Sequence, residues 1–239
     1  MYVTVQPDNT LLRAIPEARW RRLGGKLAWH KYERGQALQG PEDPLDNIIF
    51  PLRGVVSLLF SPHSGKHTEV AMVGNEGFVG VPLLIHSERT LMLAVAQTEG
   101  EAVSMDADTF LRCLSRLPNF ASLARRYAQA LLIMLGQGSA CNSTHIIDRR
   151  CARWILAIHD RANGYPLRIT QEALSRAMGV RRASVGRACR QLERQGLIAY
   201  GRARLTVVNR AALENFACPC YRIVKSEFER LLPEHVSRG

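Results

Sequence analysis

Apolar residues between residue 27 and about residue 110 occur in short runs, and glycines separate these runs. Short apolar and β-branched runs bounded by glycine turns are typical of β-strands. The strand-like runs are Asn47–Phe50, Val55–Phe60, Glu69–Val73, Leu91–Ala96 and Ala102–Met105. Their regular spacing predicts a small antiparallel barrel or jelly roll. Ahead of it, Leu11–Leu23, with Pro16 near its start, predicts a helix packed against that barrel.

A second pattern begins after Pro118, where apolar residues alternate at steps of four and three, as along a coiled-coil seam. The stripe comprises Phe120, Ala124, Tyr127, Leu131, Met134, Gly138, Cys141 and His145. Periodicity alone does not distinguish a helix lying on its own barrel from a helix paired with a second chain, and we favour the dimer seam. Gly136 and Gly138 each destabilise a helix interior by about 1 kcal/mol relative to alanine. They therefore predict that this helix is least stable at its end near the domain boundary, where it can act as a hinge.

The part of the chain from residue 145 onward predicts mainly helices. His145–Arg161 has one apolar helical stripe, and Arg168–Gln195 predicts two short helices joined by a tight turn. Gly179 lies where this turn needs a positive φ, and Thr170 lies where it can cap the first helix. This is the arrangement of a helix-turn-helix, whose second helix enters the major groove of DNA.

A short hairpin follows the second of these helices, with Arg202 and Arg204 near its tip. A helix-turn-helix followed by such a hairpin is a winged helix, whose wing usually rests on the phosphate backbone. The remaining predicted elements are hairpin strands at Leu197–Tyr200 and Leu205–Val208, helices near Ala211–Phe216 and Tyr221–Leu232, and a turn at Cys218–Tyr221.

Charge is divided unevenly along the 239 residues. Residues 1–143 hold 14 Lys and Arg against 13 Asp and Glu, whereas residues 144–239 hold 18 against 8. A nearly neutral first part and a basic second part indicate a sensor joined to a module that binds a polyanion. The apolar runs are too short for a membrane span, the N-terminus lacks a secretion signal, and six cysteines in such a chain indicate a reducing cytoplasm.

These features together resemble the Crp/Fnr family of bacterial transcription regulators. The resemblance is strongest in ITQEALSRAMGVRRASVGRACRQLERQGLI, and LDNIIFPLRGVVSL and EGFVGVPLL resemble the family's β-roll. It implies an α+β fold with a β-roll sensor over residues 1–116, a dimerisation helix and hinge over 117–144, and a winged helix-turn-helix over 145–239. It further implies a homodimer that binds a pseudo-palindrome in double-stranded DNA, with RNA polymerase as a further partner.

Within the family, the second helix of the motif has an Arg-Glu-x-x-x-x-Arg type of reading surface, and the matching positions are Arg182, Ala183 and Arg187. Each arginine can pair with both the O6 and the N7 atom of a guanine. Ala183 replaces the carboxylate that would accept from cytosine, so the preferred half-site need not be the family's usual one.

Arg181 occupies the position where the second helix needs its cap, and arginine supplies no capping oxygen there. We therefore expect it to contact phosphate. The further residues expected on the DNA backbone are Thr170, Gln171, Ser184, Arg190, Arg202 and Arg204.

The sensor half gives a weaker indication of its ligand. Members of the family that bind cyclic nucleotides use a Gly-Glu pair for the ribose and an Arg-Ser/Thr pair for the phosphate. The candidate effector pocket here contains Gly80, Val81, Arg89 and Thr90. Because Val81 replaces the ribose-binding glutamate, cyclic AMP is not the expected effector; no cofactor is required, and the effector is unknown.

The cysteines do not predict a metal site. An iron–sulfur cluster needs several converging thiolates, the first cysteine is Cys113, and Cys218 with Cys220 is an incomplete set. Cys189, beside the arginines of the second helix, is a candidate redox-sensitive thiol, with burial as the more ordinary alternative.

Two alternatives to a DNA-binding regulator depend on the β-roll. One alternative is a cupin-like metal enzyme with His63, His67 and Glu69 as ligands, but the spacing of these residues lacks the expected His-x-His core. A signalling module that does not bind DNA is the other alternative, and the basic winged helix argues against it. Because no catalytic motif is present, the sequence predicts a protein that is not an enzyme.

Overall fold

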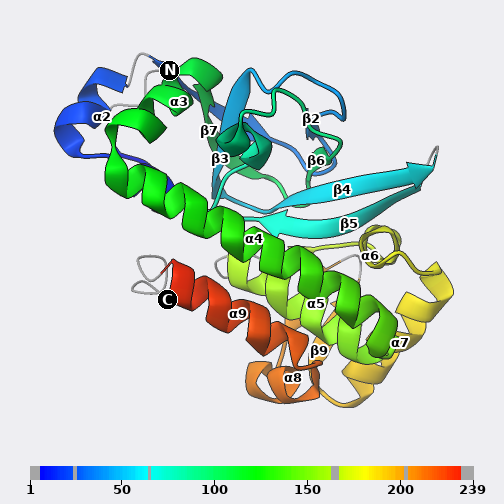
Figure 1. Ribbon diagram of the computed structural model, residues 1–239. Helices are drawn as coiled ribbons and strands as arrows, with labels where there is room; N and C mark the ends of the chain where they lie inside the picture. Colours follow the sequence, from blue (N-terminus) through cyan, green and yellow to red (C-terminus); the bar gives the residue numbers. More distant parts are fainter. Residues whose placement is uncertain (1–5, 24–25, 64–65, 163–166, 202–203, 233–239) are drawn as a thin grey trace.

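The computed structural model describes residues 6–23, 26–63, 66–162, 167–201 and 204–232. A two-sheet β-roll forms one end of the molecule, short helices with a small sheet form the other, and a long helix, α4 (Pro118–Thr144), connects them (Figure 1). The predicted α+β class and the predicted order of β-roll, long helix and helix-turn-helix are confirmed. None of the helices in the described ranges combines the length and the apolar character that crossing a membrane requires.

The β-roll consists of two antiparallel sheets with strand orders β1-β7-β3 and β2-β6-β4-β5. The strands are β1 (Leu27–Tyr32), β2 (Ala37–Gln39), β3 (Asn47–Arg53), β4 (Val56–His63), β5 (Lys66–Val73), β6 (Leu93–Ala96) and β7 (Gly100–Asp106). Each named run matches one of β3 to β7, whereas β1 and β2 lie within the predicted β region but outside the named runs. A short 3-10 helix, η2 (Val81–Ile85), lies between β5 and β6.

The helices that flank the β-roll differ from the expectation in two places. The predicted helix over residues 11–23 is two helices, α1 (Thr10–Arg13) and α2 (Glu17–Leu23). They are separated at Pro16, because a proline disfavours helical backbone at the residue that precedes it. The helix α3 (Ala107–Arg116) was not predicted. It follows β7 directly because the side chain of Asp106 caps it by accepting from the Thr109 amide.

The apolar stripe of α4 packs against the β-roll of the same chain. Phe120, Ala124 and Tyr127 are fully buried, and Phe78 of the β-roll core has its ring centroid 5.1 Å from that of Tyr127. The prediction that this stripe forms a dimer seam was therefore wrong. The same periodicity arises when a helix buries one face against its own domain.

The C-terminal half forms around α5 (Ile147–Arg161). The remaining elements are β8 (Leu167–Arg168), α6 (Gln171–Met178), α7 (Arg182–Arg194), β9 (Ile198–Gly201), β10 (Arg204–Val207), α8 (Arg210–Phe216) and α9 (Cys220–Leu231). β10 pairs with both β9 and β8, so the predicted two-stranded wing has a third strand. Helix α9 runs beside α4 (Figure 1).

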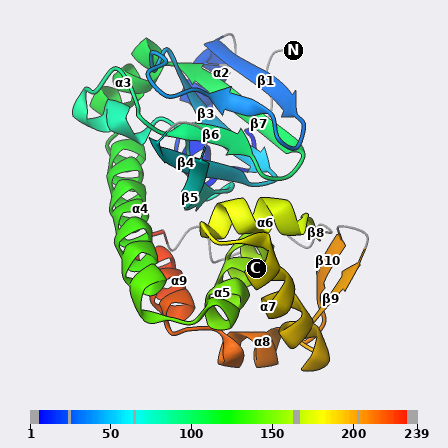
Figure 2. The same ribbon diagram turned by 90° about the vertical axis from the view of Figure 1, so that its right-hand side faces the viewer.

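The two halves contact each other directly below the β4–β5 hairpin, where α6 lies (Figure 2). The indole Nε1 of Trp154 on α5 donates to Glu69 Oε1 of β5 at 2.6 Å. Arg161 at the end of α5 forms an ion pair with Glu76, with an Nε–Oε1 distance of 2.7 Å, and both side chains are almost fully buried. The orientation of the helix-turn-helix relative to the β-roll is thus held by hydrogen-bonded contacts.

Candidate nucleic-acid interface and sensor cavities

The helix-turn-helix has the local geometry that its sequence predicts. The Thr170 hydroxyl oxygen accepts from the Ala173 amide and caps α6. Gly179 ends α6 in the left-handed conformation with φ of 63°, and its amide closes the last turn on the Arg176 and Ser175 carbonyls. These two residues fix the start of α6 and the direction in which the chain enters α7.

One face of α7 is buried and the other presents arginines. Val185, Ala188, Cys189 and Leu192 are fully buried in the C-terminal core. Arg182, Ala183 and Arg187 are exposed on the opposite face. The structure therefore leaves all three predicted base-reading residues accessible to a groove.

The predicted backbone-contacting residues surround this face. Arg181 and Arg190 are exposed, and Arg181 occupies the N-cap of α7 without a side-chain capping bond. Thr170, Gln171 and Ser184 are half-buried at the adjoining end of the motif. Arg204 is exposed on β10, directly opposite Arg168 of β8, whereas Arg202 lies outside the described residues.

Cys189 does not lie on the arginine face. Its thiol is buried in the core of the motif beside Cys151, whose hydrogen bond lowers the pKa of Cys189 despite the opposing effect of burial. Oxidation-sensing thiols need solvent access as well as thiolate character. We therefore do not retain the redox hypothesis for Cys189.

The candidate effector pocket in the β-roll is nearly filled. Gly80, Val81 and Thr90 line a space of about 10 Å³, which is the size of a single water site. Thr90 is buried, and its hydroxyl accepts from the Met92 amide, whereas Arg89 is exposed on the surface. The four residues do not form a cavity of nucleotide size.

A much larger cavity, of about 1120 Å³, lies between the two halves and is lined by β5, α4, α5 and α9. Glu69 lines it and accepts hydrogen bonds from Ser57 and Trp154. Burial raises the pKa of Glu69 to about 7, although both hydrogen bonds oppose this effect. Of the other two residues of the possible metal site, His67 is half-buried, and the side chain of His63 lies outside the described residues.

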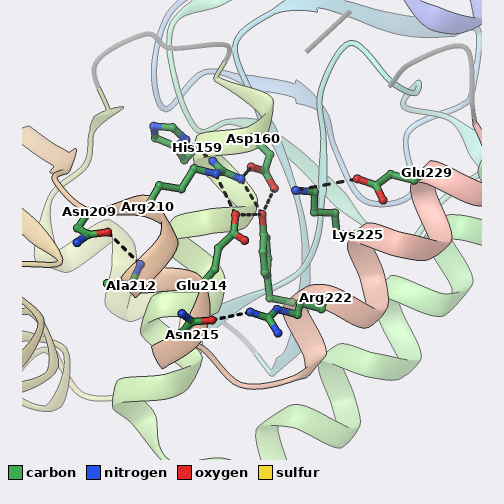
Figure 3. Close-up of polar contacts among 11 residues, drawn as sticks. His159, Asp160, Asn209, Arg210, Ala212, Glu214, Asn215, Arg222, Lys225 and Glu229 are labelled. Atoms are coloured by element: carbon green, nitrogen blue, oxygen red, sulfur yellow. Dashed lines mark hydrogen bonds and ion pairs between the residues drawn. The ribbon is translucent and has the colours of Figure 1, made fainter. Parts of the chain in front are cut away.

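A polar network holds α8 and α9 to α5 at one end of this cavity (Figure 3). Arg210 donates to Asp160 Oδ1 at 2.5 Å and to Glu214 Oε1 at 3.0 Å. Its Nη1 lies 2.9 Å from His159 Nδ1. Burial, joined by the charge of Arg210, lowers the pKa of His159, so that nitrogen accepts the hydrogen bond at neutral pH. The Tyr221 hydroxyl of α9 donates to Asp160 Oδ2 at 3.0 Å, so the network ties both α8 and α9 to α5.

The structure also gathers cysteines that the sequence separates. Cys141 and His145 at the end of α4 meet Cys218 and Cys220 at the start of α9. Only Cys218 and Cys220 are related by their local sequence, because Cys141 precedes Cys218 by 77 residues. Among the described residues, these four side chains form the group whose ligand atoms lie close enough together to bind one metal ion.

Comparison with known proteins places these two halves in one family. Residues 29–117 match the family model of the cyclic nucleotide-binding domain, and residues 149–216 match that of the Crp-like helix-turn-helix domain. The chain belongs to the Crp/Fnr family of transcription regulators.

The similarity to relatives in this family extends over most of the chain. The global nitrogen regulator of Synechococcus elongatus is 26% identical over 219 residues, which are 86% of this chain and 96% of the relative. Two solved structures share the fold. FixK2 from Bradyrhizobium japonicum has a TM-score of 0.69 and 16% identity, over 80% of this chain and 98% of that one. A putative Crp/Fnr regulator from Eubacterium rectale has a TM-score of 0.67 and 13% identity, over 86% and 96%.

Proposed function

We propose that this family member binds a pseudo-palindromic operator as a homodimer and reads it with the exposed face of α7. The observation that carries the proposal is the accessibility of Arg182, Ala183 and Arg187 on a helix whose other face is buried. Each arginine is expected to pair with a guanine edge, and Ala183 can contact a thymine methyl group.

Arg181, Arg190 and Arg204 are proposed to contact phosphates. Arg181 supports this role best, because it gives α7 no capping bond and is exposed at the helix N-terminus. Its replacement by alanine should weaken binding to all sequences alike and reduce the salt slope by about one unit. The loss of preference at a single base pair would instead make Arg181 a base-reading residue.

The homodimer is proposed to form through the outward face of α4. Exposed residues on this face recur at steps of three and four: Ser122, Arg125, Gln129, Leu132 and Gly136. Leu132 is 62% exposed within the chain, and Gly136 has open space around it. Sedimentation equilibrium should show a dimer that Leu132→Asp converts to a monomer; an unchanged dimer would place the interface elsewhere.

The signal is proposed to be something other than cyclic AMP. The filled space beside Val81 and the surface position of Arg89 support this. Calorimetric titration with cyclic AMP should give no heat of binding, and operator affinity should be unchanged by it. Saturable binding in the micromolar range would overturn the proposal.

The deciding experiment is selection of sites from a random duplex library at near-physiological salt. We expect enrichment of two half-sites about 34 Å apart, which is one helical turn. Arg182→Ala and Arg187→Ala should each cost about 1–3 kcal/mol and relax one base position. Arg116→Ala, an exposed arginine on α3, is the matched control and should leave the selected sequence unchanged. Failure of the wild-type chain to enrich any sequence, with or without cell extract, would refute sequence-specific recognition.

The remaining parts of the proposal follow from the family. A transcription regulator acts on DNA in the cytoplasm of a bacterium, and contact with RNA polymerase is its direct route to activation. Run-off transcription with purified polymerase, on a template that contains the selected operator, tests that contact. A change in transcript level that Arg182→Ala abolishes is the expected result.

A further inference from the structure

Four metal-binding side chains from two distant segments converge where α4 ends. Cys141 lies in the last turn of α4, and His145 follows that helix at its C-cap. Cys218 and Cys220 flank the proline that begins α9. The three cysteine Sγ atoms and one ring nitrogen of His145 all lie within 4.8 Å of one another.

Their spacing is close to that around one tetrahedral ion. With Zn–S bonds of about 2.3 Å and Zn–N bonds of about 2.0–2.1 Å, two sulfurs are about 3.8 Å apart and a sulfur and a nitrogen about 3.6 Å apart. Here Cys141 Sγ and Cys218 Sγ are 3.4 Å apart, and Cys220 Sγ and His145 Nδ1 are 3.6 Å apart. The remaining pairs, which lie within 4.8 Å, need to shorten by at most about 1.2 Å to complete the tetrahedron.

The surroundings differ from those of cysteines that merely fill a core. Cys141, Cys218 and Cys220 are buried in a cluster of their own, separate from the cores of both halves. The Gln137 amide donates to Cys220 Sγ at 3.1 Å, which is the kind of hydrogen bond that orients a metal ligand. Two arginine side chains of α5, Arg150 and Arg153, lie near enough to offset the charge of bound thiolates.

We propose that Cys141, His145, Cys218 and Cys220 bind a single divalent transition-metal ion, with Zn²⁺ as the ion whose ligand preference they match. Three thiolates and one imidazole with no open position make a structural site, not a catalytic one. An iron–sulfur cluster fits less well, because its several irons would need ligands spread farther apart than these.

The location gives the ion a role beyond DNA recognition. It would tie the end of α4 to the start of α9, close to the junction from which α5 and the winged helix continue. Because binding to the folded state alone stabilises that state, metal uptake should protect this junction from unfolding.

Cobalt(II) titration of the full-length chain tests the site without DNA, so its result is independent of the proposed operator binding. Protein that has been reduced, stripped with a chelator and kept anaerobic should take up one Co²⁺ per chain. The complex should show the visible bands of a tetrahedral ion and the near-ultraviolet thiolate-to-cobalt charge-transfer band, and one equivalent of Zn²⁺ should displace it.

Two ligand variants and one control make the assignment specific. Cys220→Ser should weaken or abolish the charge-transfer band, and His145→Gln, at a half-exposed position, should reduce cobalt affinity by more than about 10-fold. Cys113→Ala removes a buried thiol on α3, away from the proposed site, and should bind cobalt like the wild type.

The proposal fails if the reduced wild-type chain takes up no stoichiometric Co²⁺ or Zn²⁺. It also fails if Cys113→Ala loses as much affinity as Cys220→Ser. A disulfide between Cys141 and Cys218 in the purified protein, combined with no metal uptake after reduction, would assign the cluster to thiol chemistry instead.

Discussion

The Glu69 carboxylate gives the stability of this protein a dependence on pH of unusual sign. A carboxylate that is ion-paired in the native state stabilises a fold when it is ionised. Glu69 differs, because burial raises its pKa to about 7 from an ordinary value of 4.5. The folded state then holds a proton that the unfolded state has lost. Between pH 4.5 and pH 7 stability therefore falls as pH rises.

The magnitude follows from the same pKa values. Each unit of difference corresponds to about 1.4 kcal/mol, so the loss between these limits is at most about 3 kcal/mol. Water that enters the adjoining cavity would reduce it. Glu69→Gln imitates the protonated acid: its oxygen can accept from Trp154, and its amide can donate to Ser57, whose hydroxyl can turn to Gln97 at 3.3 Å.

Urea unfolding between pH 5 and pH 8 is the assay, followed by circular dichroism and tryptophan fluorescence. We expect Glu69→Gln to remove most of the decline in unfolding free energy and to exceed the wild type at pH 8 by up to about 3 kcal/mol. Glu88→Gln, at an exposed position, is the control and should keep the wild-type profile. Parallel wild-type and Glu69→Gln profiles across this range would refute the reasoning.

Three further substitutions test the packing of the long helix and the junction. Gly77→Ala should destabilise the fold by about 1–3 kcal/mol in urea unfolding, because its Cβ would lie 2.1 Å from the buried Tyr127 ring; wild-type stability would show that the ring can move. Arg161→Met should lower the free energy of unfolding by about 3–5 kcal/mol, because it removes the ion-pair partner of the buried Glu76 carboxylate. On the Glu76→Gln background the same substitution should cost less, and the difference measures the coupling between Arg161 and Glu76. On the monomeric Leu132→Asp background, Gly136→Ala should raise the melting temperature, since alanine gains about 1 kcal/mol in a helix and nothing in the same chain lies within 4 Å of the added methyl group; a lower melting temperature there would contradict this reasoning.

Local signals made the helix-turn-helix predictable from the sequence. The cap at Thr170, the left-handed Gly179 and the uncapped Arg181 each depend on a few neighbouring residues, and the structure has all three as expected. Strands β3 to β7 were predictable for the same reason, since glycine turns and apolar runs are local patterns. The exposure of the α7 arginines then follows from the periodicity of its buried face.

Features that depend on which surfaces meet were not predictable. The stripe of Phe120 and Tyr127 has the same spacing whether it packs on its own β-roll or on a partner, and only the tertiary fold distinguishes these cases. The approach of Cys141 to Cys218 requires α9 to return beside α4. The filling of the β-roll pocket likewise arises from side chains of several strands.

The contacts between the winged helix and the β-roll set a minimum free energy that any signal must supply to change the orientation of the winged helix. Arg34 donates to the Arg168 carbonyl at 2.8 Å, and a Cβ at Gly179 would lie only 3.3 Å from Thr68, so the reading motif touches the roll at several points. An effector that turned the motif away would have to replace the free energy of these contacts. Moving such an equilibrium from 1:99 to 99:1 takes about 5.5 kcal/mol of differential affinity. A ligand that binds both arrangements with similar affinity therefore leaves the orientation of the winged helix unchanged, however tightly it binds, and the strength of this docking sets the differential affinity that an effector needs.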